Sequence, residues 1–190
     1  RTKKSQKVTI VGAIVDFLLS VFKVIVGVIG NSGALVADGI HSFSDLLTDW
    51  VTWYAAKQAG EAPDKEHPYG HERFETVATL GLSIFLAIIG TAIIFDAMGR
   101  LTNAGALNHE SWLIAAAGLS IASKEALYWY TVTVAKNINS EMLKANAWHH
   151  RSDAFSSVVV IIGIVGAING YYYLDSAAAI IVGIMIIYIG

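Results

Sequence analysis

The fold is decided by two stretches of sequence, VVVIIGIVGAI at Val158–Ile168 and AAAIIVGIMIIYI at Ala177–Ile189. Neither stretch alternates between apolar and polar residues, as the strands of a membrane β-barrel do. In lipid, only helices and closed barrels satisfy every backbone N–H and C=O group. The two stretches therefore predict membrane-spanning α-helices.

Six apolar blocks of the 190-residue chain are each long enough to cross about 30 Å of hydrocarbon at about 1.5 Å per residue. The sequence predicts an all-α protein, a bundle of six transmembrane helices in one transmembrane domain over residues 1–190. We expect these helices at about residues 8–30, 34–56, 77–98, 111–135, 143–166 and 171–190.

Composition excludes several classes of protein. Hydrophobic residues make up 55% of the chain and charged residues only 15%, whereas a soluble domain carries about a quarter charged residues. A net charge of −2 argues against a nucleic-acid partner. The chain has no cysteine, which excludes disulfides, thiolate metal sites and cysteine nucleophiles. We expect an integral, multi-pass membrane protein whose surroundings are the lipid bilayer, in the cell (inner) membrane.

Orientation follows from the basic residues in the short loops, which are retained on the cytoplasmic side. Between the predicted helices, Arg100 is the one basic residue on one side of the membrane. The other side holds nine basic residues: Arg1, Lys3, Lys4, Lys7, Lys57, Lys65, Arg73, Lys136 and Lys144. This bias predicts that both termini are cytoplasmic.

Two of the predicted helices carry an imidazole and a carboxylate four residues apart. His41 and Asp45 lie on one face of the second helix, and His149 and Asp153 lie on one face of the fifth. A charge near the bilayer centre costs about 2.5–3.5 kcal/mol or more, so such groups usually mark a pathway or a site. Facing each other, the two pairs supply two nitrogens and two oxygens, a set that can surround Zn²⁺ tetrahedrally.

Other ionisable residues in the helices have less specific roles. Asp38 and Asp49 extend the polar face of the second helix. Asp38 would either help the metal leave on the outer side or form a hydrogen bond with a neighbouring helix. Asp49 lies near the cytoplasmic end of the helix, where we expect it to face water. We expect Asp16 and Lys23, seven residues apart on the first helix, to neutralise each other through other helices, in a structural role. Lys124 is expected to serve in a similar interior pair.

The segment PDKEHPYGHERFE at residues 63–75 is the longest polar connection. Pro68 and Gly70 break a helix there, but a loop can still fold around a metal held by Asp64, His67 and His71. Spacing alone leaves two interpretations open, a second metal site or a solvated polar loop.

Three motifs together resemble the cation diffusion facilitator family of divalent-metal/proton antiporters. They are ADGIHSFSD at residues 37–45, HPYGHER at residues 67–73 and HHRSDA at residues 149–154. The resemblance implies a transport site at His41, Asp45, His149 and Asp153, and it favours a loop site at Asp64, His67 and His71. It also implies a homodimer and a cytosolic C-terminal domain, which we expect to be absent from this chain. Zinc is the usual cargo of members with two histidines and two aspartates.

Counting charges suggests how such a site would work. Two carboxylates and two neutral imidazoles carry −2, which either a divalent cation or two protons would neutralise. Metal and protons compete for the same atoms, which predicts zinc export in exchange for protons by alternating access. Fe²⁺, Cd²⁺, Co²⁺ and Ni²⁺ are alternative cargoes. A membrane metal sensor or scaffold that binds without transport remains an alternative function. No H-E-x-x-H motif occurs in the sequence, which argues against a metalloenzyme.

Overall fold

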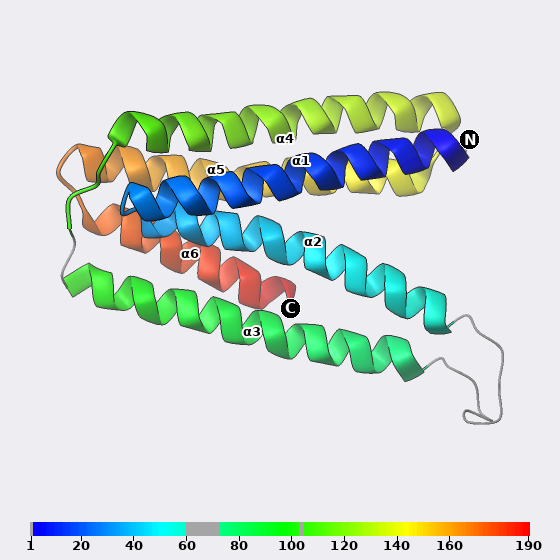
Figure 1. The fold of residues 1–190 in the computed structure, drawn as a ribbon, viewed down its shortest axis with the longest axis horizontal. Coiled ribbons are helices and arrows are strands. Elements are labelled where there is room, and N and C mark those ends of the chain that lie inside the picture. Colours follow the sequence, from blue (N-terminus) through cyan, green and yellow to red (C-terminus); the bar gives the residue numbers. More distant parts are fainter. Residues whose placement is uncertain (1, 60–72, 103–104) are drawn as a thin grey trace.

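The computed structural model describes residues 2–59, 73–102 and 105–190. Within these ranges the chain forms six α-helices and no strand (Figure 1). Their bounds are α1 Thr2–Ile29, α2 Gly33–Ala59, α3 Arg73–Thr102, α4 Glu110–Ile138, α5 Glu141–Ile168 and α6 Tyr173–Ile189.

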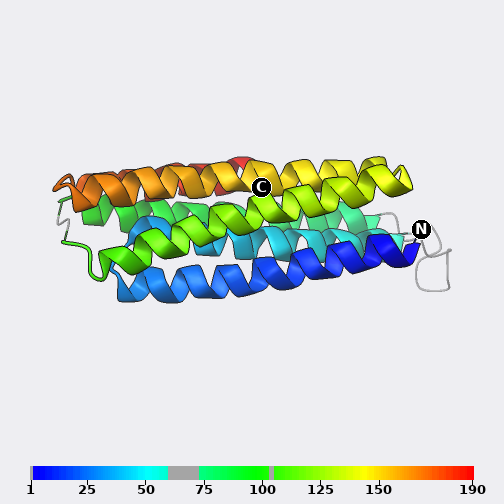
Figure 2. The same cartoon turned by 90° about the horizontal axis from the view of Figure 1, so that it is seen from above.

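The helices lie lengthwise side by side, as the two perpendicular views show (Figures 1 and 2). Helix α1 packs against α2 and α4, and α5 packs against α4 and α2, so these four helices enclose the centre of the bundle. Helix α6 packs on α2 and α5, and α3 lies outside it. The N-terminus, the last residues of α2 and the first residues of α3 lie at the same end of the molecule (Figure 1).

Most helices extend beyond the apolar blocks that the sequence analysis outlined. Helix α3 spans 30 residues and begins at Arg73, whereas the apolar block begins at Val77. Backbone hydrogen bonding continues into the polar flanks, where water can solvate the side chains without ending the helix. Helix α6 is the exception, because it begins two residues later, at Tyr173.

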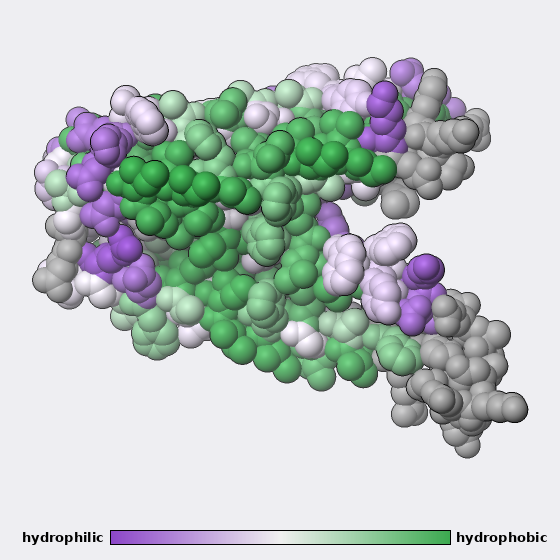
Figure 3. Space-filling view, viewed as in Figure 1, coloured by the Kyte–Doolittle hydropathy of each residue, from purple (hydrophilic) through white to green (hydrophobic). Residues whose placement is uncertain are grey.

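Three of the described helices contain segments long and apolar enough to span a membrane: Lys7–Ile29, Thr76–Thr102 and Leu143–Ile168. Helix α6 is apolar but shorter. Helices α2 and α4 are less apolar because they carry ionisable side chains, of which Asp38 and Lys124 are buried. Apolar side chains cover much of the outer surface (Figure 3), as expected of a surface that faces lipid.

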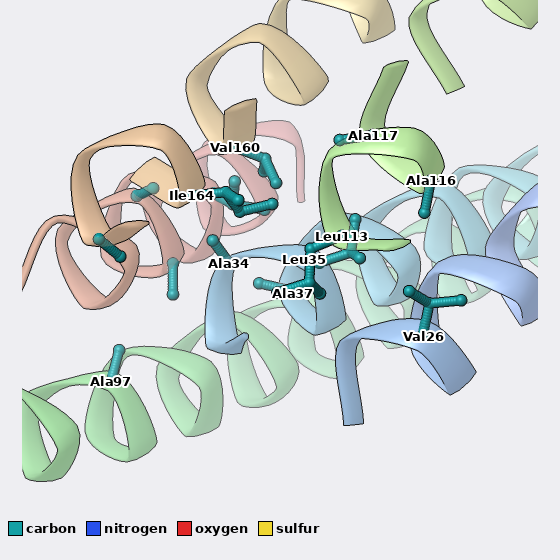
Figure 4. Packing of buried hydrophobic residues seen from close by; sticks show 14 of the residues in the cluster. Val26, Ala34, Leu35, Ala37, Ala97, Leu113, Ala116, Ala117, Val160 and Ile164 are labelled. Carbon is teal, nitrogen blue, oxygen red and sulfur yellow. The ribbon is translucent and has the colours of Figure 1, made fainter. Parts of the chain in front are cut away.

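The main apolar core fills the half of the bundle away from the N-terminus. It joins Val26 near the end of α1, Leu35 near the start of α2, Leu113 near the start of α4 and Ile164 near the end of α5 (Figure 4). Helices also approach one another closely in this half. A Cβ built on Gly163 of α5 would lie 2.9 Å from the backbone oxygen of Leu174, so only glycine allows α6 to approach this closely.

The start of α2 is held in place by a carboxylate from α6. Asp175 is buried and accepts hydrogen bonds from Ser32 Oγ at 2.5 Å and from the backbone N–H of Gly33 at 2.7 Å. Amide groups at a helix N-terminus have no intrahelical partner, and a carboxylate stabilises them. This contact fixes the depth of α2, and hence of the polar side chains one to three turns further along it.

Candidate metal centre

Three side chains from α2 and α5 converge near the middle of the bundle. His41, Asp45 and Asp153 each offer a donor atom, and these three atoms lie within 4.8 Å of one another. The side chains are 3%, 11% and 8% exposed, respectively. One imidazole and two carboxylates held so closely, away from bulk water, form a donor set for a divalent cation.

The spacing of four residues places each imidazole beside a carboxylate, as the sequence predicts. His41 Nδ1 lies 3.8 Å from Asp45 Oδ1, and His149 Nε2 lies 3.7 Å from Asp153 Oδ2. Both distances are too long for good hydrogen bonds. The pairs are close enough for a cation to join their members, but they do not satisfy each other.

His149 is the predicted ligand that lies apart from the other three. It adjoins Asp153, but its side chain is 41% exposed and does not belong to the group of three converging donors. The structure therefore brings together His41, Asp45 and Asp153 and leaves His149 at the edge of the cluster, partly exposed.

The surface of the molecule is hollowed at the end of the bundle that carries the N-terminus (Figure 3). The space-filling view shows a hollow there, between the ends of α2 and α3 and the ends of α1, α4 and α5 (Figure 3). Asp49, one turn beyond Asp45 on α2, is exposed.

Asp38 is engaged in hydrogen bonds with its neighbours. It is 0% exposed, and its carboxylate accepts hydrogen bonds from Lys23 Nζ at 3.0 Å, Ser156 Oγ at 2.8 Å and Ser157 Oγ at 2.8 Å. Lys23 Nζ also donates to Ser42 Oγ at 2.7 Å. Of the two roles open to Asp38, the structure shows the hydrogen-bonding one, which links α2 to α1 and α5.

Asp16 and Lys23 have the structural role expected of them, in ion pairs with other helices, but they do not pair with each other. Lys23 binds Asp38, whereas Asp16 Oδ1 lies 2.8 Å from Lys124 Nζ. Its other oxygen lies 3.6 Å from Nδ1 of His150. Residues two turns apart on one helix share a face but both point outward, so each finds its partner on a neighbouring helix.

Lys124 forms an interior ion pair, as the sequence analysis expected, but its contact with Asp153 of the donor cluster was not predicted. Its ammonium, 2% exposed, donates to Asp153 Oδ2 at 3.0 Å as well as contacting Asp16. The signal was a lysine near the middle of a predicted membrane helix, because such a cation must find an acid on another helix. Asp64, His67 and His71, the predicted loop ligands, lie outside the described residues.

Comparison with known proteins identifies the family of the chain. Residues 9–190 match the family described as "Cation efflux transmembrane domain". The chain is 36% identical over 203 residues to Metal tolerance protein C1 of Arabidopsis thaliana. The aligned region covers 99% of this chain and 43% of that protein. It is 32% identical over 193 residues to the manganese efflux system protein MneP of Bacillus subtilis, with 98% of this chain and 65% of that protein covered.

A third relative is the magnetosome protein MamB of Magnetospira, 33% identical over 169 residues, with 89% of this chain and 58% of that protein covered. The chain thus spans between 43% and 65% of the length of these three relatives.

A bundle of helices, three of them long and apolar enough to span a membrane, has the architecture of a multi-pass membrane protein. The chain belongs to the cation efflux family, the cation diffusion facilitators that its motifs resemble. It is a multi-pass membrane protein of a family of metal-cation efflux transporters.

Proposed function

We propose that this protein exports a divalent metal cation, Zn²⁺ in the first place, in exchange for protons. The observation that carries the proposal is the convergence of His41, Asp45 and Asp153 within 4.8 Å inside the bundle. His149, beside Asp153, would complete four donors of the kind that Zn²⁺ binds tetrahedrally. Cd²⁺, Fe²⁺, Co²⁺ and Ni²⁺ suit similar ligands and remain alternative cargoes.

Mn²⁺ is a second candidate cargo, and the exposure of His149 favours it. With that imidazole at the edge, the inner donors are two carboxylates and one imidazole, an oxygen-rich set that suits Mn²⁺ better than four mixed ligands do. The similarity to a manganese efflux protein of Bacillus subtilis points the same way. Uptake assays with the two metals in competition separate the candidates.

Proton exchange follows from the charges that surround the donors. Asp45 and Asp153 contribute −2, while the neighbouring charges of Asp16 and Lys124 cancel. Either one divalent cation or two protons neutralise the cluster, and both compete for the same atoms. A carrier that exchanges a divalent cation for two protons keeps the charge of the site near zero in both directions of transport.

Alternating access would connect the site to the two sides in turn. A hollow lies at the end of the bundle that carries the N-terminus (Figure 3), and the main apolar core lies in the opposite half. With the termini cytoplasmic, as the basic residues predict, this shape is the inward-facing state of an exporter in the cell membrane. We further propose that the protein acts as a homodimer, as its family resemblance implies.

Asp45→Ala is the direct test of this function. In proteoliposomes with an imposed pH gradient, the rate of radioactive zinc uptake by the variant is expected to be at least about 100-fold lower than that of wild type. The reason is that the variant lacks a carboxylate ligand of the transported ion. Asp49→Asn, one turn away and exposed, is the matched control and is expected to stay within about threefold of wild type.

Uptake by Asp45→Ala at the wild-type rate would exclude the proposed site. If the wild-type protein binds zinc in calorimetry but moves none across the vesicle membrane, it is a sensor or scaffold and not a carrier.

A second metal site in the loop, at Asp64, His67 and His71, is also proposed. It rests on the HPYGHER motif at residues 67–73. Counting the zinc ions bound per purified chain tests it, because the loop site would raise the count from one to two. A count of one removes the loop site and leaves the transport site intact.

A further inference from the structure

Lys124 of α4 lies between carboxylates from two other helices. Its Nζ is 2.8 Å from Oδ1 of Asp16 on α1 and 3.0 Å from Oδ2 of Asp153 on α5. The side chain is 2% exposed, so water does not screen its charge. The two carboxylates offset the free-energy cost of burying this ammonium.

One of these two anions also belongs to the candidate metal centre. Asp153 is among the three converging donors, and the same oxygen, Oδ2, contacts Lys124 and lies 3.7 Å from His149 Nε2. A divalent cation bound to Asp153 and an ammonium hydrogen-bonded to the same carboxylate would repel each other strongly at this separation. The two cations therefore compete for Asp153.

The second anion offers the ammonium an alternative position. Asp16 lies outside the group of converging donors, and its contact with Lys124 is already the shorter of the two. A small shift of the lysine side chain toward Asp16 would release Asp153 without leaving the ammonium unpaired. The desolvated charge would keep a partner throughout this shift.

We propose that Lys124 is a tethered counter-cation that holds Asp153 when the site is empty and yields it to the metal by moving toward Asp16. This inference rests on the proposed function, because it assumes that Asp153 binds the cargo. In this role Lys124 is a positioning residue that acts through Asp153. It keeps metal affinity low enough for the cargo to leave, since conduction and transport require release as well as binding.

Two substitutions are expected to shift metal affinity in opposite directions. In Lys124→Gln, the competing charge is gone, and the dissociation constant for Zn²⁺ should fall at least about tenfold. In Asp16→Asn, the ammonium has only Asp153 to pair with, and the dissociation constant should rise at least about threefold. Lys124→Arg keeps the charge and should remain near wild type. Isothermal titration calorimetry of the purified protein at one fixed pH measures all three.

A purely structural role for Lys124 would not produce opposite shifts, because loosening the site would weaken metal binding in both variants. Equal or weaker binding by Lys124→Gln overturns the proposal. Should that variant fail to fold, the double variant Asp16→Asn/Lys124→Gln removes both partners of the buried pair together. The double variant must bind Zn²⁺ more tightly than Asp16→Asn alone, and the opposite order also overturns the proposal.

Asp153→Ala separates this inference from the function on which it rests. If Asp153→Ala binds Zn²⁺ like wild type, the proposed metal site is wrong, and the role of Lys124 is wrong with it. If Asp153→Ala loses binding while Lys124→Gln does not tighten it, the metal site stands and only the counter-cation is excluded.

Discussion

Two polar clusters that include residues of α2 lie about one turn apart along this helix and differ in how well their carboxylates are hydrogen-bonded. We call the first the sealed cluster; it consists of Lys23, Asp38, Ser42, Ser156 and Ser157. The second is the open cluster, formed by His41, Asp45 and Asp153. In the sealed cluster, Asp38 accepts hydrogen bonds from Lys23, Ser156 and Ser157 at 2.8–3.0 Å and is 0% exposed.

The open cluster leaves a carboxylate unsatisfied. Oδ2 of Asp45 is buried and has no hydrogen-bond partner among the residues that the structure describes. Its nearest cationic candidate, His41, stands 3.8 Å from the other oxygen. A buried carboxylate without donors is costly, whereas one with several donors is stable. The same residue type thus stabilises the fold in one cluster and is available to a cation in the other.

Removing one charge from each cluster is expected to give the largest difference in stability between the two clusters. Lys23→Met leaves Asp38 buried without its counter-ion and should lower the free energy of unfolding by about 3–5 kcal/mol. Asp45→Asn removes a carboxylate that lacks a partner and should leave stability unchanged or raise it by about 1 kcal/mol. Thermal unfolding in detergent, with a chelator present to remove metal, measures both variants.

An equal loss of stability in the two variants would mean that the open cluster is structural as well. With Zn²⁺ added, the contrast should reverse. Wild type gains stability from bound metal, and Asp45→Asn gains much less, because ligand binding to the folded state raises stability.

The two histidines sharpen the comparison within the open cluster. His41→Ala is expected to weaken zinc binding about 100-fold, because the imidazole is buried and nothing replaces it. His149→Ala should weaken binding about tenfold, since its side chain is 41% exposed and water can take its place. Calorimetric titration measures both, with His109→Asn at the far end of the bundle as the control.

The order of these two effects is informative. If His149→Ala costs as much as His41→Ala, then His149 turns inward to become a full ligand when metal binds. If it has no effect, then His41, Asp45 and Asp153 alone hold the cargo, and the oxygen-rich set favours Mn²⁺.

The smallest expected effect tests a neutral donor of the sealed cluster. Ser157 Oγ donates to Asp38 Oδ2 at 2.8 Å and lies 3.1 Å from Ser120 Oγ. Ser157→Ala should lower the free energy of unfolding by about 1–2 kcal/mol, the cost of one lost hydrogen bond to a charged acceptor. Ser152→Ala, exposed on the same helix, is the matched control, and a similar loss there would show that the method does not resolve the cluster.

Much of this architecture could be predicted from the sequence alone, without knowledge of how the helices pack. Long apolar stretches such as Val158–Ile168 specify membrane helices, because lipid leaves the backbone few alternatives. The spacing of His41 and Asp45 places both on one helix face through the local periodicity of about 3.6 residues per turn. Even the pairing of the second and fifth helices was predictable, because each carried the same imidazole and carboxylate.

The sequence by itself therefore determined the six helices and the set of donors, since both depend on local composition and periodicity. Only the tertiary structure decided which charge pairs with which. Asp16 meets Lys124 and Lys23 meets Asp38, although Asp16 and Lys23 share a helix face. The tertiary structure also placed His149 at the edge of the site. The rotation and depth of each helix come from packing and from contacts such as the one between Asp175 and Gly33, which no periodicity within a single helix specifies.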